Sequence, residues 1–156
     1  MDFEDEEIIK LWKIFHEHDV KYILVGGFAV SLHGHSRLTA DVDIWIKDSP
    51  DNRKKLFAAL EEIGLELPES FESIDFIPGW STIYIPSGVE LDIMSWMKGL
   101  PQEKFDDCFS ISMIAEIHQV PVRFLHLNHL LEAKRASARP QDLLDVAELE
   151  RLYKLK

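Results

Sequence analysis

The chain has 156 residues, 46% of them hydrophobic, and its 28 acidic and 17 basic residues give a formal net charge of −11. This composition excludes a disordered chain, and the length suits one domain with a sizeable core. A charge this negative disfavours binding of long, non-specific nucleic acid, which depends on clustered lysine and arginine. No apolar run approaches the ~20 residues that span a bilayer, so we expect no membrane association.

The N-terminal segment and the cysteine content predict a cytoplasmic protein. Residues 1–7 are strongly acidic and lack an apolar stretch, so we expect no signal peptide. Cys108 is the only cysteine, which excludes an internal disulfide and suits a reducing compartment.

In the first half of the chain, apolar periodicity and turn residues predict alternating helices and strands. The expected elements are a helix over 3–18, a strand over 21–25, a helix over 28–33, a strand over 42–47 and a helix from about 49 to 63. Gly26 and Gly27 separate the first strand from the second helix. Ser49 is a candidate N-cap, Pro50 suits the first helical position, and Gly64 ends the helix.

The second half is predicted to contain a hairpin, two more strands and a helical end. We expect an irregular segment over 65–79 with a short strand at 74–77, a hairpin of strands 81–85 and 89–94, a short helix over 101–107, strands over 110–117 and 120–125, and helices over 127–137 and 141–155.

This order of elements predicts an α/β (α+β) fold, with a mixed central sheet, flanking helices and a C-terminal helix pair. We expect a single domain over 1–156. Residues 1–125 would form its sheet-containing core and residues 126–156 a C-terminal helical appendage.

Acidic residues gather on two of the predicted strands. Asp41 and Asp43 alternate along one strand and therefore share a face, and Asp92 lies on a later strand that can lie beside it. Neighbouring carboxylates repel each other, so their presence indicates a divalent cation or a ligand between them. Glu90 shares the face of Asp92 and is an alternative third ligand.

Three segments together resemble the nucleotidyltransferase superfamily of the DNA polymerase β type. They are G-G-F-A-V at 26–30, R-L-T-A-D-V-D at 37–43, and the L-D-I that contains Asp92. The chain is most similar to small bacterial members, namely AbiEii-like toxins and aminoglycoside or lincosamide adenylyltransferases. The C-terminal K-R-A-S-A-R-P-Q-D-L-L-D is similar to the helices that end many of these proteins.

The resemblance implies a set of site residues. Asp41, Asp43 and Asp92 would be catalytic and would bind two Mg²⁺ ions, with Mn²⁺ as an alternative. The nucleotide would be bound by Gly26, Gly27, Arg37, Thr39, Lys134 and Arg139. Two-metal chemistry of this kind positions a triphosphate and neutralises its charge.

Several of these residues have other plausible roles. Asp92 is an alternative base toward the acceptor hydroxyl. Arg37 has a structural alternative, an ion pair with Asp41 or Asp48. We expect Asp142 and Asp145 to form salt bridges with Arg139 or Arg135.

The implied function is a metal-dependent nucleotidyltransferase that moves an NMP from an NTP to a hydroxyl of a tRNA, a protein or a small molecule such as an antibiotic. A protein partner of the toxin–antitoxin type is also implied. The alternative is a catalytically degenerate binding module, either a nucleotide sensor or an antitoxin-type partner protein.

Overall fold

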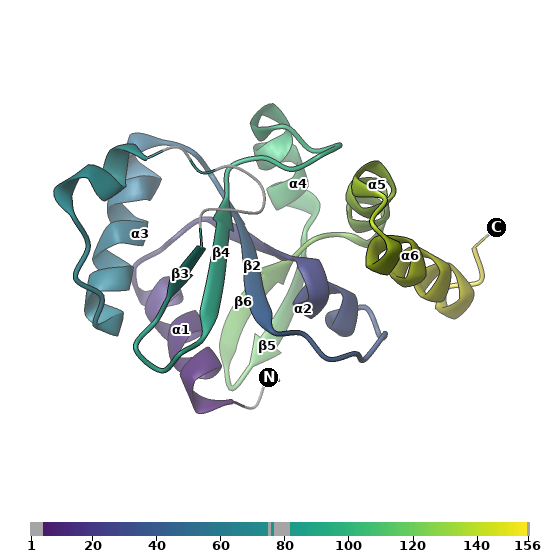
Figure 1. The fold of residues 1–156 in the computed structure, drawn as a ribbon, viewed down its shortest axis with the longest axis horizontal. Coiled ribbons are helices and arrows are strands. Elements are labelled where there is room, and N and C mark those ends of the chain that lie inside the picture. The colour runs from purple at the N-terminus through teal and green to yellow at the C-terminus, as the bar shows by residue number, and fades with distance from the viewer. Residues whose placement is uncertain (1–4, 75, 77–81, 156) are drawn as a thin grey trace.

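The computed structural model describes residues 5–74, 76 and 82–155 (Figure 1). The strands are β1 (Tyr22–Val25), β2 (Asp41–Ile46), β3 (Thr82–Tyr84), β4 (Glu90–Met94), β5 (Met113–Ile117) and β6 (Val120–Phe124). The α-helices are α1 (Glu6–Glu17), α2 (Gly26–Leu32), α3 (Pro50–Ile63), α4 (Phe105–Ile111), α5 (Leu127–Ser137) and α6 (Pro140–Leu152), and the short 3-10 helices are η1 (Glu69–Ser73) and η2 (Gln102–Lys104).

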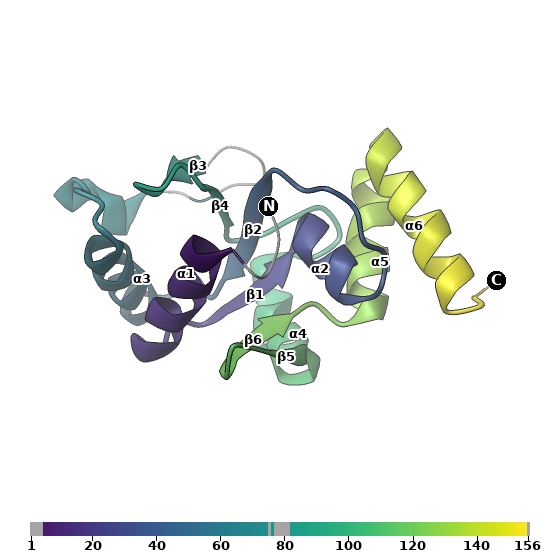
Figure 2. The same ribbon diagram turned by 90° about the horizontal axis from the view of Figure 1, so that it is seen from below.

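The strands form one mixed sheet in the order β3-β4-β2-β1-β6-β5. Pairs β1/β2, β3/β4 and β5/β6 are antiparallel, whereas β2/β4 and β1/β6 are parallel. Helices α1 and α3 lie on one side of the sheet, and α2, α5 and α6 lie toward the other (Figure 2). The predicted fold class, a mixed central sheet with flanking helices and a C-terminal helix pair, is confirmed.

Helix α1 begins at a side-chain cap and buries one face. The carboxylate of Asp5 accepts a hydrogen bond from the backbone N–H of Glu7, as expected of an N-cap residue. Trp12 is fully buried, and its ring stacks on that of Tyr22 in β1 with centroids 5.8 Å apart. The apolar face of α1 thus covers the sheet, as its periodicity predicts.

Helix α3 is fixed to the sheet by one buried amide. The Ser49 hydroxyl caps the helix by accepting from Asn52 N–H, and Gly64 ends it in the left-handed conformation at φ 114°. The Asn52 side chain accepts from Lys21 N–H and donates to the carbonyl oxygens of Lys21 and Lys47. It therefore joins α3 to the start of β1 and the end of β2.

Some predicted boundaries are wrong. The strand predicted over 110–117 begins only at Met113, because residues 105–111 form α4, which buries Phe105 and Cys108 three positions apart on one helical face. The helix predicted over 101–107 is accordingly divided into η2 and α4.

The strand predicted over 74–77 is also wrong for the residues that can be compared. Ile74 and Phe76 lie outside any strand, and residues 75 and 77 lie outside the described part of the chain. The Phe76 carbonyl instead accepts a hydrogen bond from the hydroxyl of Ser95 at 2.5 Å. The preceding residues form η1 where an irregular segment was predicted.

Helices α5 and α6 are in contact with each other, cross at an angle and lie on the α2 side of the molecule (Figures 1 and 2). Asp142 caps α6 by accepting from the backbone N–H of Arg139 at 3.1 Å. No helix within the described residues is long and apolar enough to cross a membrane.

Candidate active site

Four carboxylates lie on one face of the neighbouring strands β2 and β4. The two strands pair in parallel, with Asp41 opposite Glu90 and Asp43 opposite Asp92. Because side chains alternate along a strand, the intervening Val42 and Leu91 point to the other face, where both are fully buried. This register brings the acidic residues together, as the sequence predicted.

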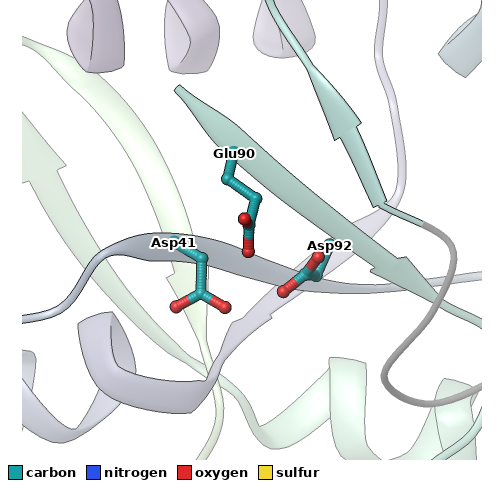
Figure 3. A group of neighbouring side chains, drawn as sticks. All are labelled: Asp41, Glu90 and Asp92. Carbon is teal, nitrogen blue, oxygen red and sulfur yellow. The ribbon is translucent and has the colours of Figure 1, made fainter. Parts of the chain in front are cut away.

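Three of these side chains converge on a common space (Figure 3). Asp41, Glu90 and Asp92 each offer one carboxylate oxygen, and the three oxygens all lie within 4.8 Å of one another. Glu90 thus joins the group together with Asp92, although the sequence presented the two as alternatives. Asp43 lies outside this group and packs against Gly26.

The same face of β2 is closed at its other end. Trp45 is fully buried, its indole N–H donates to the Ser95 carbonyl at 2.7 Å, and its ring meets the edge of Phe105 from α4. The face is therefore covered at Trp45, whereas Asp41 and Asp43 line an open cleft.

Crowding of the carboxylates shifts their pKa values in opposite directions. Burial, a hydrogen bond with Asp92 and repulsion from Asp92 and Glu90 raise the pKa of Asp41 to about 6. Burial, together with the charges of Asp41 and Asp92, raises the pKa of Asp43 well above its usual value. Burial also acts on Asp92, but hydrogen bonds from Asp41, Thr82 and Asp43 outweigh it and lower its pKa.

These carboxylates fit a hard divalent cation. One oxygen each of Asp41, Glu90 and Asp92 lies within 4.8 Å of the other two, and positive charge placed between them would relieve the mutual repulsion of the carboxylates. Mg²⁺ and Mn²⁺ prefer carboxylate oxygens of this kind.

The glycine pair brings helix α2 close to the acidic strand. Gly26 has φ +66°, and a Cβ there would lie 2.0 Å from Oδ2 of Asp43. A Cβ on Gly27 would lie 2.7 Å from Oγ1 of Thr39. Both positions therefore require glycine for packing. Val25 is the N-cap residue of α2 and makes no side-chain cap, because valine has no polar side-chain atom.

Thr39 connects this turn to the acidic strand. Its hydroxyl lies in the space that the missing Cβ of Gly27 leaves, and it donates to the Asp41 carbonyl at 3.1 Å. It therefore fixes the start of β2 against α2.

An ionic cluster built around the buried side chains of Lys134, Asp142 and Asp145 forms the facing wall of the cleft. Arg37 donates from Nε to Oδ1 and from Nη2 to Oδ2 of Asp145, at 2.8 and 2.9 Å. Lys134 Nζ lies 2.9 Å from Asp145 Oδ2 and 3.3 Å from Asp142 Oδ1. Arg139 Nε donates to Asp142 at 2.8 Å.

These pairings correct part of the sequence analysis. Arg37 pairs with Asp145, not with Asp41 or Asp48, because Asp48 accepts from Arg53. The predicted salt bridge between Asp142 and Arg139 is confirmed.

The other expected partner, Arg135, does not join this cluster. It pairs instead with Glu150 of α6 at 3.4 Å. Asp145 is held by Arg37 and Lys134 in its place.

The ionic cluster leaves a net positive charge facing the four acids. Burial opposes ionisation of Asp142 and Asp145, but hydrogen bonds from the surrounding cations and other donors lower the pKa of both. Two carboxylates are thus set against three cations. The charge of Lys134 lowers the pKa of Asp43, and the charges of Asp41 and Asp43 help to raise the pKa of Arg139.

Acids and cations line one cleft of about 750 Å³ between the sheet, loop 37–40 and helices α5 and α6. All nine site residues named from the sequence line it: Gly26, Gly27, Arg37, Thr39, Asp41, Asp43, Asp92, Lys134 and Arg139.

Sequence reasoning missed other residues of the cleft wall, namely Met94, Met97, Lys98, Ser137 and Gln141. Met97 and Lys98 reach the cleft because the turn that contains them packs on α5, where a Cβ on Gly99 would lie 3.0 Å from Ala136 Cβ. No local pattern indicates this packing. Gln141 was detectable, since it precedes Asp145 by one helical turn and donates to it at 3.0 Å.

The chain is similar to known nucleotidyltransferases in sequence pattern and in fold. A family model described as "Nucleotidyltransferase of unknown function (DUF6036)" matches residues 5–155. No curated protein sequence is similar enough to count as a match.

Two solved structures share the fold. An antigenic nucleotidyltransferase-like protein from Paracoccidioides brasiliensis is 20% identical, with a TM-score of 0.56 over 96% of this chain and 77% of that one. ANT(2")-Ia, in complex with adenylyl-2"-tobramycin, is 16% identical, with a TM-score of 0.56 over 94% of this chain and 87% of that one.

Proposed function

The chain belongs to the family of nucleotidyltransferases of unknown function (DUF6036), and on that premise we propose that it transfers an NMP from an NTP to an acceptor hydroxyl. The superfamily resemblance drawn from the sequence is confirmed by this membership and by the fold. The observation that carries the proposal is the cleft itself. Its one wall presents convergent carboxylates, and its facing wall presents cations.

Asp41, Asp43 and Asp92 are the proposed metal ligands, with Glu90 as a fourth carboxylate beside Asp41 and Asp92. We propose two Mg²⁺ ions, with Mn²⁺ as the alternative. When bound, such ions neutralise the triphosphate and stabilise the charge on the attacking and leaving oxygens.

The nucleotide phosphates are proposed to lie between the acids and the ionic cluster. Arg37, Lys134 and Arg139 supply positive charge from one side. Gly26 and Gly27 line the same cleft, and their backbone N–H groups are proposed further phosphate donors. Thr39 acts indirectly, because its hydroxyl is bonded to the Asp41 backbone.

The proposed reaction forms one bond and breaks one bond at the α-phosphorus. The acceptor oxygen attacks the α-phosphorus, and the bond from that phosphorus to the bridging oxygen of the β-phosphate breaks. Pyrophosphate leaves with the electron pair. Asp92 is the alternative to be tested as acceptor of the hydroxyl proton, because its carboxylate lies beside those of Asp41 and Glu90 on the cleft face of the sheet.

The size of the cleft favours a small acceptor or an exposed chain end. A volume of about 750 Å³ lies within the range of small-molecule pockets. A small molecule such as an antibiotic, the end of a tRNA and a protein side chain are therefore the acceptor classes to test. A protein partner of the toxin–antitoxin type belongs to the same proposal.

We propose that residues 1–125 and 126–156 act as one domain. The acids come from the first segment, and Lys134 and Arg139 come from the second. Neither segment alone contains both walls of the cleft.

Incubation with α-³²P-labelled NTPs, Mg²⁺ and a panel of tRNA, cell lysate and antibiotics tests the proposal. The expected result is label transfer with release of pyrophosphate, lost in Asp41→Asn and Asp92→Asn. Asp106→Asn is the matched control, because Asp106 is exposed, pairs with Lys47 and does not line the cleft.

Two outcomes would contradict the proposed enzyme. Transfer that survives in both site variants would show that the acids are not catalytic. Magnesium-dependent NTP binding with no transfer to any acceptor would favour the alternative, a degenerate module that senses a nucleotide or binds a partner protein.

A further inference from the structure

Asp145 of α6 is fully buried, and its three closest side-chain partners, Arg37, Lys134 and Gln141, all line the cleft, while His35 Nε2 lies 3.9 Å from its Oδ1. Oδ1 accepts from Arg37 Nε and Gln141 Nε2, and Oδ2 accepts from Arg37 Nη2 and pairs with Lys134 Nζ. Burying a carboxylate and its cationic partners costs desolvation free energy, and the ion pairs often do no more than offset that cost. The burial of Asp145 is therefore weak evidence that its role is only to stabilise the fold.

Asp142, one turn earlier on the same helix, has a different set of partners. Its Oδ2 accepts from the Ser137 hydroxyl and from the backbone N–H of Arg139, so it closes the turn between α5 and α6. Asp145 makes no such bond to the helix ends. Its partners come from loop 37–40, from α5 and from its own helix.

We propose that Asp145 is a positioning residue that aims Arg37 and Lys134 at the phosphate groups of the nucleotide. This inference rests on the proposed function. In this role Asp145 does not contact the nucleotide. Its carboxylate joins loop 37–40, α5 and α6 in the wall of the cleft.

The geometry of Arg37 supports this role. Its fork is held by two parallel hydrogen bonds, which fix the plane of the guanidinium. The remaining nitrogen, Nη1, donates to the Leu38 carbonyl at 3.2 Å and lies 3.4 Å from where a Cβ on Gly27 would be. Asp145 therefore holds one guanidinium nitrogen beside the start of α2.

Lys134 is oriented by the same carboxylate. Its ammonium group has three donors, and it is directed to Asp145 Oδ2 and Asp142 Oδ1. The side chain is 7% exposed, which leaves it few other rotamers. Because Lys134 also lines the cleft, we assign its third donor to a ligand bound there.

Titration calorimetry with magnesium tripolyphosphate and magnesium ATP tests the inference. Asp145→Asn should weaken both by roughly tenfold or more, because charged hydrogen bonds orient both cations. Binding of Mn²⁺ alone should stay within about twofold of the wild type, because the metal ligands lie on the opposite wall. A merely structural role would weaken both kinds of binding together.

A double-mutant comparison separates positioning from direct binding. Adding Asp145→Asn to Arg37→Met/Lys134→Met should cause no further loss if Asp145 acts through those two cations. An additional loss of the same size would overturn the inference. Glu148→Gln is the matched control, because this residue pairs with Arg151 on the same helix and does not line the cleft.

If Asp145→Asn fails to fold, Arg37→Lys makes the test. Lysine keeps the positive charge opposite Asp145 but loses the two-bond fork. We expect a similar loss of tripolyphosphate binding, and unchanged binding would overturn the inference. A wild-type protein that binds no nucleotide would overturn the proposed function as well, whereas nucleotide binding retained in Asp145→Asn would overturn the inference alone.

Discussion

Replacing Asp41 by asparagine should stabilise the metal-free protein at neutral pH. Burial and the neighbouring acids raise the pKa of Asp41 from 3.8 to about 6. A rise of this size corresponds to about 3 kcal/mol of destabilisation once the group is ionised, and partial exposure to solvent reduces it to about 1–2 kcal/mol. Asparagine removes the charge and can donate to the remaining carboxylates.

The sign of the effect follows from proton binding. Because the pKa is higher in the folded state, the folded protein binds more protons between about pH 4 and pH 6, and its stability falls as the pH rises through that window. The asparagine variant lacks this contribution. It should therefore exceed the wild type by about 1–2 kcal/mol near pH 7, and the difference should vanish near pH 4.

Urea denaturation of both proteins at the two pH values measures this difference. Asp106→Asn is the surface control, and its exposed pair with Lys47 should matter by less than about 1 kcal/mol at either pH. The reasoning is refuted if Asp41→Asn is less stable than the wild type at neutral pH, or if the difference between the two proteins does not change with pH.

Three other predictions concern packing and metal binding. Gly26→Ala should lower the free energy of unfolding by about 2–4 kcal/mol, because the new Cβ meets Asp43 at 2.0 Å in a left-handed backbone. In the control Gly88→Ala the new Cβ meets nothing within 4 Å, so only about 1 kcal/mol of backbone strain is expected. Equal losses of stability of the two variants in thermal denaturation would refute the packing argument. Asn52→Ala should cost about 2–4 kcal/mol in urea denaturation because it leaves buried backbone groups unpaired, and a loss below about 0.5 kcal/mol would contradict that role. Saturating Mn²⁺ should raise the thermal midpoint of the wild type but not of Asp92→Asn, and an equal rise in both would argue against this carboxylate as a ligand.

Local sequence patterns were sufficient to predict most of the helices and strands. The apolar stripe that buries Trp12, the cap at Ser49 and the glycine at position 64 each act within one or two turns of chain. The hairpin of β3 and β4 was also predictable from its turn. Alternation then placed the acids on one face of each strand, and their partnership required only that the two strands be neighbours.

The ionic wall of the cleft was less predictable because its pairs are distant in sequence. Arg37 and Asp145 are 108 residues apart, whereas nearer acids such as Asp48 were the candidates that spacing suggested. Asp48 instead accepts a hydrogen bond from Arg53, five residues away. The acid with which Arg37 forms its ion pair depends on how α6 packs beside α2. The periodicity of neither helix specifies that packing.

The central claim is that the carboxylates of β2 and β4 bind a nucleotide through a divalent metal. Calorimetric titration of ATP, CTP, GTP and UTP with Mg²⁺, into the wild type and Asp41→Asn/Asp43→Asn, tests it most directly. The account predicts binding of at least one nucleotide that requires Mg²⁺ and is lost in the double variant. No binding of any nucleotide, or binding that persists in the double variant, would contradict it.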